Sequence, residues 1–122
     1  MSKTYKVIYS PQALQDLTEI YEYIRFTLQA RIAADKQSSR IRKMIRSLAT
    51  LPERHTLVEW EPWVSMKIYK VPVDNYMVFY RIDDELNTVS IVRIFYSGRN
   101  IEELIKNVND ELYEGRFLPF LH

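Results

Sequence analysis

The chain has 122 residues and no cysteine, and its 17 basic and 16 acidic side chains leave a net charge of +1. This length suits one domain over residues 1–122, and the lack of cysteine excludes disulfide bonds and thiolate metal sites. No apolar run approaches the roughly 20 residues of a membrane-spanning helix, and the N-terminus lacks a signal-peptide core. His55 and His122 are too far apart to suggest a metal site. We therefore expect a cytoplasmic protein with no membrane segment, metal or cofactor.

A strand and then a helix are predicted at the start of the chain. Residues 5–9 alternate in polarity and are rich in β-branched and aromatic side chains, which predicts a strand. Ser10 and Pro11 suit the N-cap and the first turn of a helix. The apolar face of that helix has residues at three- and four-residue spacing: Leu14, Leu17, Ile20, Tyr21 and Ile24. Its opposite side is acidic and is expected to face solvent: Asp16, Glu19 and Glu22.

A second helix is predicted after a break near residues 27–31, and Pro52 ends it because the residue before a proline is pushed out of the α region. Its apolar positions again have helical spacing: Ala34, Ile41, Met44, Ile45, Leu48 and Leu51. Lys36, Arg40 and Lys43 form a basic stripe on it, which in most proteins is only a solvated helix face. The short link between the helices predicts an antiparallel hairpin.

The second half of the chain changes to a period of two. Strands are predicted over residues 64–71, 75–82 and 88–96, with short turn-rich links that favour an antiparallel meander. Residues 53–62 look irregular. We expect the helical hairpin to cover one face of the sheet and to leave the other partly open. The first strand is expected to join the sheet at its edge or beside the last strand.

A last helix is predicted from Asn100 to about Gly115, with Glu102 and Glu103 in its first turn, where acidic side chains are favourable. The fold class is thus α+β: an N-terminal strand, an antiparallel helical hairpin, a three-stranded antiparallel meander joined by the first strand, and a C-terminal helix. Residues 116–122 are apolar and form either an arm packed on this domain or an arm that binds a partner.

Three stretches of this sequence resemble the RelE/ParE toxin superfamily of bacterial type II toxin–antitoxin systems, which includes plasmid-stabilisation proteins. They are YSPQA at residues 9–13 with the helix that follows, SLATLP at 47–52, and VDNYMVFYRID at 73–83 followed by RIFY and GR within 93–99. Each stretch alone is a weak signal. Together they stand in the order of the superfamily, on the element order derived independently above, and the tail from Tyr113 onward matches nothing.

The resemblance implies a growth-inhibiting toxin that is neutralised by a cognate antitoxin, with a homodimer or a toxin–antitoxin hetero-oligomer as the assembly. It also implies two different mechanisms. RelE-like members are mRNA interferases that cleave mRNA on the ribosome without a metal, whereas ParE-like members poison DNA gyrase and need no catalytic residues. Because the fold is shared, the fold cannot choose between them. A third alternative is a non-toxic remnant that only binds its partner.

A metal-independent endoribonuclease needs a general base, a proton donor and cations around the phosphate. On the RelE-like pattern, three residues are candidates for catalysis: Arg81, Tyr96 and Arg99. Three others are candidates for RNA binding: Lys67, Lys70 and Arg93. Met77 stands where RelE-like nucleases carry arginine, and Arg81, which should lie on the same side of its strand, is the predicted replacement.

The two mechanisms remain open at this stage, with a slight preference for the nuclease and the gyrase poison as the alternative. Tyr96 and Arg99 favour the nuclease, whereas Met77, the near-neutral net charge and the tyrosine-rich first helix favour the gyrase poison. Each candidate also has an ordinary interpretation. The strand cations are equally well explained as solvated partners of cross-strand acids, and the tyrosines as half-buried sheet residues. Trp60 and Trp63 either stack on RNA bases or, as we favour, cap the core.

Overall fold

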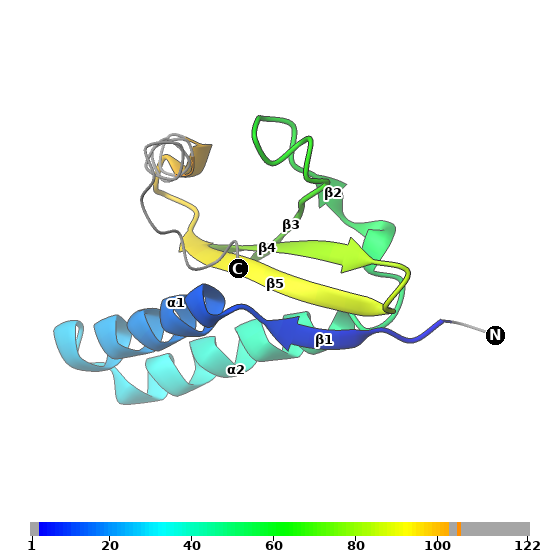
Figure 1. Ribbon diagram of the computed structural model, residues 1–122. Coiled ribbons are helices and arrows are strands. Elements are labelled where there is room, and N and C mark those ends of the chain that lie inside the picture. Colours follow the sequence, from blue (N-terminus) through cyan, green and yellow to red (C-terminus); the bar gives the residue numbers. More distant parts are fainter. Residues whose placement is uncertain (1–2, 103–104, 106–122) are drawn as a thin grey trace.

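The computed structural model describes residues 3–102 and 105, in which a helical hairpin packs on one face of a five-stranded sheet (Figure 1). The α+β fold class is confirmed. In chain order the elements are β1 (Lys6–Tyr9), α1 (Pro11–Glu22), the π-helix η1 (Tyr23–Thr27), α2 (Arg31–Ser47), the 3₁₀ helix η2 (Pro52–Arg54), β2 (Thr56–Leu57), β3 (Tyr69–Val73), β4 (Tyr76–Asp83) and β5 (Thr88–Tyr96).

The sheet has the strand order β1-β5-β4-β3-β2. The predicted meander is present, since β3 pairs with β4 and β4 with β5 in antiparallel fashion. β1 lies at the edge and also beside the last strand, and it pairs with β5 in parallel. A parallel pair needs a long crossover connection, and the helical hairpin supplies part of it.

The junction between β1 and α1 is held by Ser10. Its Oγ accepts a hydrogen bond from the Ala13 backbone N–H at 2.9 Å, so Ser10 is the N-cap that the sequence predicted, and Pro11 follows in the first turn. The same hydroxyl donates to the carbonyl of Val92 at 2.9 Å. Val92 is the extra residue of a β-bulge in β5, because Phe79 pairs with Arg93 while Tyr80 pairs with Ile91. Ser10 therefore satisfies a carbonyl at the bulge.

One hydrophobic core lies between the hairpin and the sheet. The hairpin contributes buried side chains from both helices and the turn after them: Ala13, Leu17, Ile41, Ile45 and Leu48. The sheet contributes its helix-facing side chains: Val71, Val73, Val78, Tyr80, Val89, Ile91 and Ile94. The apolar face of α1 is rotated from the expected one, since Leu14 is exposed whereas Ala13 is buried.

The opposite face of the sheet is covered in part, which agrees with the expected partly open face, since Ile8 and Arg81 remain exposed there. A second core there buries Val58, Trp63, Ile68, Phe79, Phe95 and Ile105. Trp60 stacks on Trp63 with ring centroids 5.4 Å apart. The segment between η2 and β3 folds back over this face, and its two tryptophans cap the second core, as favoured from the sequence.

The strand predicted from residue 64 begins only at Tyr69. The residues before it form turns, in which the Glu61 carboxylate accepts hydrogen bonds from the Ser65 backbone N–H and hydroxyl at 2.9 and 2.8 Å. Lys67 has a φ of 55° and is therefore in the left-handed region, outside the sheet. The side chains of this turn alternate in polarity by chance, which led to the prediction of a strand. The short strand β2 was not predicted.

The second helix also ends earlier than predicted. α2 stops at Ser47, and Leu51 takes the left-handed conformation with a φ of 47° before Pro52. Of the predicted C-terminal helix, Ile101 and Glu102 are helical. The remainder of that helix, apart from Ile105, and the apolar arm at 116–122 lie outside the described residues.

Asp16 is buried, which corrects its expected place on a solvent face. Its carboxylate accepts hydrogen bonds from Arg93 Nε and Nη2 at 2.8 and 2.9 Å and from the Ile94 backbone N–H at 2.9 Å. Helical spacing puts Asp16 beside Ala13 and Leu17 on the face that packs on the sheet. The prediction that Asp16 faces solvent rested on its charge alone, whereas its position on the helix places it against the sheet.

Replacement of Asp16 by alanine should lower the free energy of unfolding by about 3 kcal/mol, because it removes the buried carboxylate that accepts hydrogen bonds from Arg93 and from the Ile94 N–H. Urea unfolding followed by circular dichroism measures this change. The matched control is Glu19→Ala on the exposed side of the same helix, which should alter stability by less than about 0.5 kcal/mol. Equal losses in the two variants would contradict the importance of the pair.

Tyr80 is buried, its hydroxyl donates to the Pro52 carbonyl at 2.6 Å, and burial raises its pKa. Since the folded-state pKa lies above the unfolded one, the contribution to stability is present below about pH 10 and is lost as the pH rises further. Tyr80→Phe should cost about 1 kcal/mol at neutral pH and make the alkaline loss of stability shallower. Urea titrations at neutral and alkaline pH test this, with Tyr96→Phe as the exposed control, and an unchanged alkaline slope in Tyr80→Phe would refute it.

Candidate functional site

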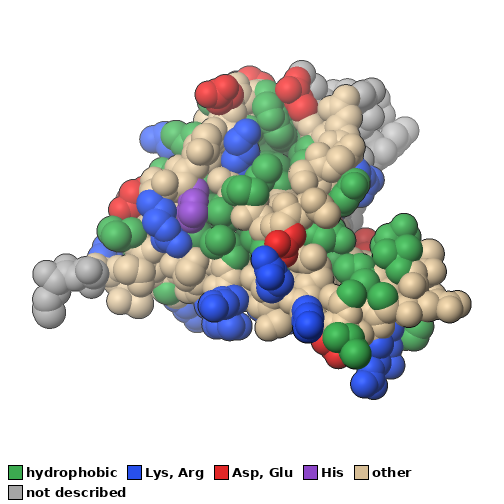
Figure 2. Space-filling model, turned by 180° about the vertical axis from the view of Figure 1, so that it is seen from behind, with side chains coloured by type: hydrophobic (Ala, Val, Ile, Leu, Met, Phe, Trp, Pro, Cys, Tyr) green, Lys and Arg blue, Asp and Glu red, His purple; other side chains and the backbone are tan. Residues whose placement is uncertain are grey.

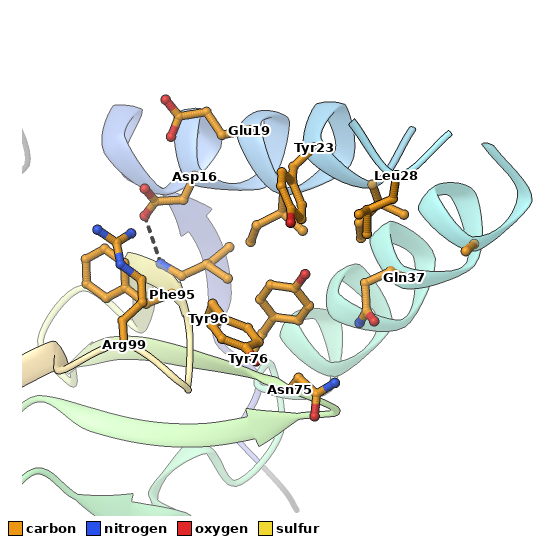
Figure 3. Close-up of a pocket in the computed structure, with 14 residues that line it drawn as sticks. Asp16, Glu19, Tyr23, Leu28, Gln37, Asn75, Tyr76, Phe95, Tyr96 and Arg99 are labelled. Carbon is orange, nitrogen blue, oxygen red and sulfur yellow. Dashed lines mark hydrogen bonds between the residues drawn. The ribbon is translucent and has the colours of Figure 1, made fainter. Parts of the chain in front are cut away.

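A cavity of about 770 Å³ lies between the helical hairpin and the ends of β4 and β5 (Figure 3). The hairpin contributes Tyr23 and Leu28 to its wall, and the sheet contributes Tyr76 and Tyr96. The two sheet tyrosines meet edge to face with ring centroids 5.9 Å apart. Burial, followed by the neighbouring Tyr96 and Tyr23, raises the pKa of Tyr76, so its hydroxyl stays neutral at physiological pH. The cavity thus has aromatic walls, with the charged side chains of Glu19 and Arg99 also in its lining.

The apolar surface continues from this cavity over the tip of the hairpin. Tyr23, Phe26, Leu28 and Ile32 are each more than half exposed there. Single exposed apolar residues are common, but a contiguous group of large ones marks an interaction surface. We call the cavity together with these side chains the hairpin groove.

The π-helix η1 shapes the wall of the hairpin groove. The wider turn is closed by hydrogen bonds from the Leu28 N–H to the Tyr23 carbonyl and from the Ala30 N–H to the Ile24 carbonyl, both 3.0 Å long. Gln29, with a φ of 53°, then reverses the chain toward α2. π-helical turns are rare and often occur at functional sites. A break was predicted in this region from the sequence, but its π-helical form was not.

Gly98 determines where the Tyr96 ring lies. A Cβ atom added at Gly98 would overlap the edge of that ring, so only glycine allows this close approach. Arg99 follows, with its guanidinium over the Phe95 ring at 5.8 Å from the centroid. Figure 3 shows Tyr96 and Arg99 on the sheet side of the cavity, opposite α1 and its π-helical extension.

The structure separates the six residues predicted for a nuclease site. Tyr96 and Arg99 line the hairpin groove. Arg93 is nearly buried in its ion pair with Asp16, and its guanidinium also lies over Phe95 at 4.3 Å from the ring centroid. The bulge in β5 places Ile91 in the core beneath the hairpin and Phe95 in the second core, so these two do not share a face as expected.

Arg81 and Lys70 belong to the other face of the sheet. Arg81 is exposed and lines a hollow of about 430 Å³. Met66 and Ile68, which belong to the second core, line the same hollow. It does share a side with Met77, as predicted, because the extra residue of the bulge is in β5 and leaves the alternation of β4 intact. Lys70 pairs with Phe79 on this face, whereas Lys67 sits in the turn before β3.

Of the two histidines, only His55 belongs to the described residues. His55 packs edge to face against Tyr80, 6.4 Å between ring centroids, and burial lowers its pKa. Within residues 3–102 and 105, no group of three His, Cys, Asp or Glu side chains could hold a metal ion. No helix among those residues is both long and apolar enough to cross a membrane.

Sequence reasoning missed the hairpin groove, although it noted the tyrosines of the first helix. Tyr23, Leu28 and Tyr76 were not candidates for any site. The available signal was that Tyr23, Phe26 and Ile32 fall at positions that cannot all join one buried helix face. Tyr76 carried no separate signal, because β1, β3 and β5 each contain a tyrosine as well.

The fold is that of the RelE/ParE toxins. The chromosomal ParDE system of P. aeruginosa superposes with a TM-score of 0.63 at 17% identity, over 78% of this chain and 98% of that one. RelBE2 of Mycobacterium tuberculosis gives a TM-score of 0.53 at 22% identity, over 76% and 91%. The RelE–RelB complex of Pyrococcus horikoshii gives 0.56 at 16% identity, over 79% and 98%.

A match to a family model identifies one family within the RelE/ParE toxins. Residues 7–101 match the ParE toxin of the type II toxin–antitoxin system parDE, and the chain belongs to this family. No curated protein matches the sequence. The superfamily inferred from the three sequence stretches is thereby confirmed, and the chain is a toxin of the type II toxin–antitoxin class.

Proposed function

We propose that this toxin inhibits growth by poisoning DNA gyrase and uses no catalytic residues. The separation of the predicted nuclease residues carries this proposal. Arg81 lies on the face of the sheet that bears the second core, whereas Tyr96 and Arg99 line the hairpin groove on the other side. Metal-free cleavage requires base, acid and cation to converge on one phosphate. Membership of the ParE family supports the same mechanism.

Ribosome-dependent mRNA cleavage is the second candidate, because Tyr96 and Arg99 line one cavity. Tyr96 is half exposed and could donate or accept a proton, and Arg99 could bind a phosphate. Lys67, Lys70 and Arg81 would have to contact the RNA from elsewhere on the molecule. At most two of the groups that RNA cleavage requires, Tyr96 and Arg99, therefore meet in one place. For this reason mRNA cleavage is the weaker candidate function.

The hairpin groove is, on this proposal, the docking site for a segment of the cognate antitoxin. The related structures of M. tuberculosis and P. horikoshii are toxin–antitoxin complexes. The groove offers exposed aromatic and aliphatic side chains around a cavity, which is the chemistry that binds an apolar helix or strand. Tyr23 and Leu28 are its expected anchors.

Induced expression in a bacterial host separates the two mechanisms when protein synthesis and DNA synthesis are followed within minutes. The gyrase proposal expects an early loss of DNA synthesis in the parent and in Arg81→Ala. Toxicity should likewise survive Tyr96→Phe, which removes only the hydroxyl a nuclease would need. An early loss of protein synthesis that Tyr96→Phe and Arg99→Ala relieve would instead establish mRNA cleavage. Normal growth of every strain would contradict both mechanisms and indicate a non-toxic remnant that only binds its partner.

Leu28→Asp should weaken the toxin–antitoxin complex by at least about tenfold, because it places an unpaired charge in an apolar contact. Titration calorimetry of the purified toxin with its antitoxin measures this loss. Leu14→Asp is the matched control, since Leu14 is a similarly exposed leucine on α1 outside the cavity. If both variants bind like the parent, the antitoxin does not dock in the hairpin groove.

A further inference from the structure

Most of the positive charge on the described helices lies on α2. The helix contains six Lys and Arg residues and one acidic residue, Asp35, whereas the whole chain has a net charge of only +1. The rest of the chain is therefore net acidic, and the cations are concentrated on this helix. Arg40 is held by Asp74 through two hydrogen bonds of 2.8 and 2.7 Å.

The other five cations of α2 are exposed and have no ion pair among the described residues: Arg31, Lys36, Arg42, Lys43 and Arg46. Surface lysines and arginines usually find an acidic neighbour when one is near, because opposite charges attract at low cost. Here the one acidic residue of the helix, Asp35, accepts a hydrogen bond from the Tyr21 hydroxyl, and Asp74 binds Arg40, so neither carboxylate pairs with the other five cations. A row of unpaired like charges of this kind favours binding of a polyanion.

The helix places these cations in two rows. Ala34, Ile41 and Ile45 are buried and mark the side that faces the sheet. At 100° per residue, Lys36, Arg40 and Lys43 fall along one flank of the exposed side, and Arg31, Arg42 and Arg46 fall along the other. Ser39 and Ile32 lie between the rows. Figure 2 shows Lys and Arg side chains following one another along the lower edge of the molecule.

We propose that the outer face of α2 binds the phosphate backbone of double-stranded DNA. A helix is about 10–12 Å across with its side chains, which matches the roughly 12 Å width of the major groove. Two flanking rows of cations would then face the two phosphate strands. The row of Arg31, Arg42 and Arg46 extends over roughly 22 Å of helix, and the row of Lys36, Arg40 and Lys43 over roughly 10 Å, so each can reach phosphates of one strand.

A nucleic acid suits this face better than an acidic polypeptide does. Protein interfaces rely on several apolar and aromatic anchors at their centre, whereas between its two rows this face has Ser39 and a single large apolar side chain, Ile32, near the start of the helix. The side chains that could reach base edges are few, so we expect binding that is independent of base sequence and strongly dependent on salt. Ser39 and the cations contact backbone chemistry that every duplex shares.

This proposal goes beyond gyrase poisoning and does not require it. The DNA binding is measured without gyrase, and gyrase poisoning is measured by the loss of DNA synthesis, so the two can fail separately. If both hold, α2 would contact the DNA segment that gyrase is handling.

The test is fluorescence anisotropy of the full-length toxin with a short labelled DNA duplex over a series of salt concentrations. The variant is Lys36→Gln/Arg42→Gln/Lys43→Gln, which keeps good helix formers and leaves Arg46 in the last turn. Its affinity at low salt should fall by at least about tenfold. The slope of log Kd against log salt should decrease by about 0.9 for each phosphate contact removed.

The matched control, Lys67→Gln/Lys70→Gln/Arg81→Gln, removes the same charge from residues outside the hairpin and should retain most of the affinity. Circular dichroism of both variants establishes that each is folded. Equal weakening by the two triple variants would overturn the proposal, because it would mean attraction by overall charge alone. No binding by the parent at low salt, or tighter binding to single-stranded RNA of the same length, would overturn it as well.

Discussion

The hydrogen bonds of the buried Asp16 carboxylate hold the two layers of this molecule together. Moving a carboxylate out of water costs several kcal/mol, and here three donors from β5 offset that cost. Two of them come from Arg93 and the third from the backbone of Ile94, beside the bulge that Ser10 also contacts. α1 is thereby fixed over β5 at one register, and its π-helical extension forms a wall over the ends of β4 and β5. The hairpin groove exists because of this docking.

The same ion pair affects what the toxin can do chemically. It withdraws Arg93 from the surface, and the bulge beside it assigns Ile91 and Phe95 to different faces. Lys70 and Arg81 lie on the face of the sheet that bears the second core, whereas Arg99, just after β5, lines the hairpin groove on the other side. A protein arranged in this way is suited to binding through separate surfaces: an apolar groove on the hairpin and, as we propose, a cationic face on α2. A net charge near zero gives no indication of that separation, because it sums charges without regard to their positions.

Much of the fold follows from short-range patterns. Ser10 and Pro11 predicted the start of α1, the alternation over residues 88–96 predicted β5 at its observed bounds, and the short links predicted the meander. The errors fell where local pattern and tertiary context disagree. Residues 64–67 alternate like a strand but form turns closed by Glu61 and Ser65, and a segment that looked irregular contributes Val58 to the second core and contains the short strand β2.

The sequence by itself determined the α+β class, the order of the elements and the toxin superfamily, because capping, periodicity and motif order are properties of neighbouring residues. The tertiary structure alone decided that Asp16 is buried, that Arg81 and Tyr96 lie on different sides of the sheet, and that Tyr23 and Tyr96 share a cavity. Each of these depends on residues far apart in the chain and on one extra residue in β5. A bulge shifts the direction of side chains by a single position, and alternation in the sequence does not reveal on which strand it occurs.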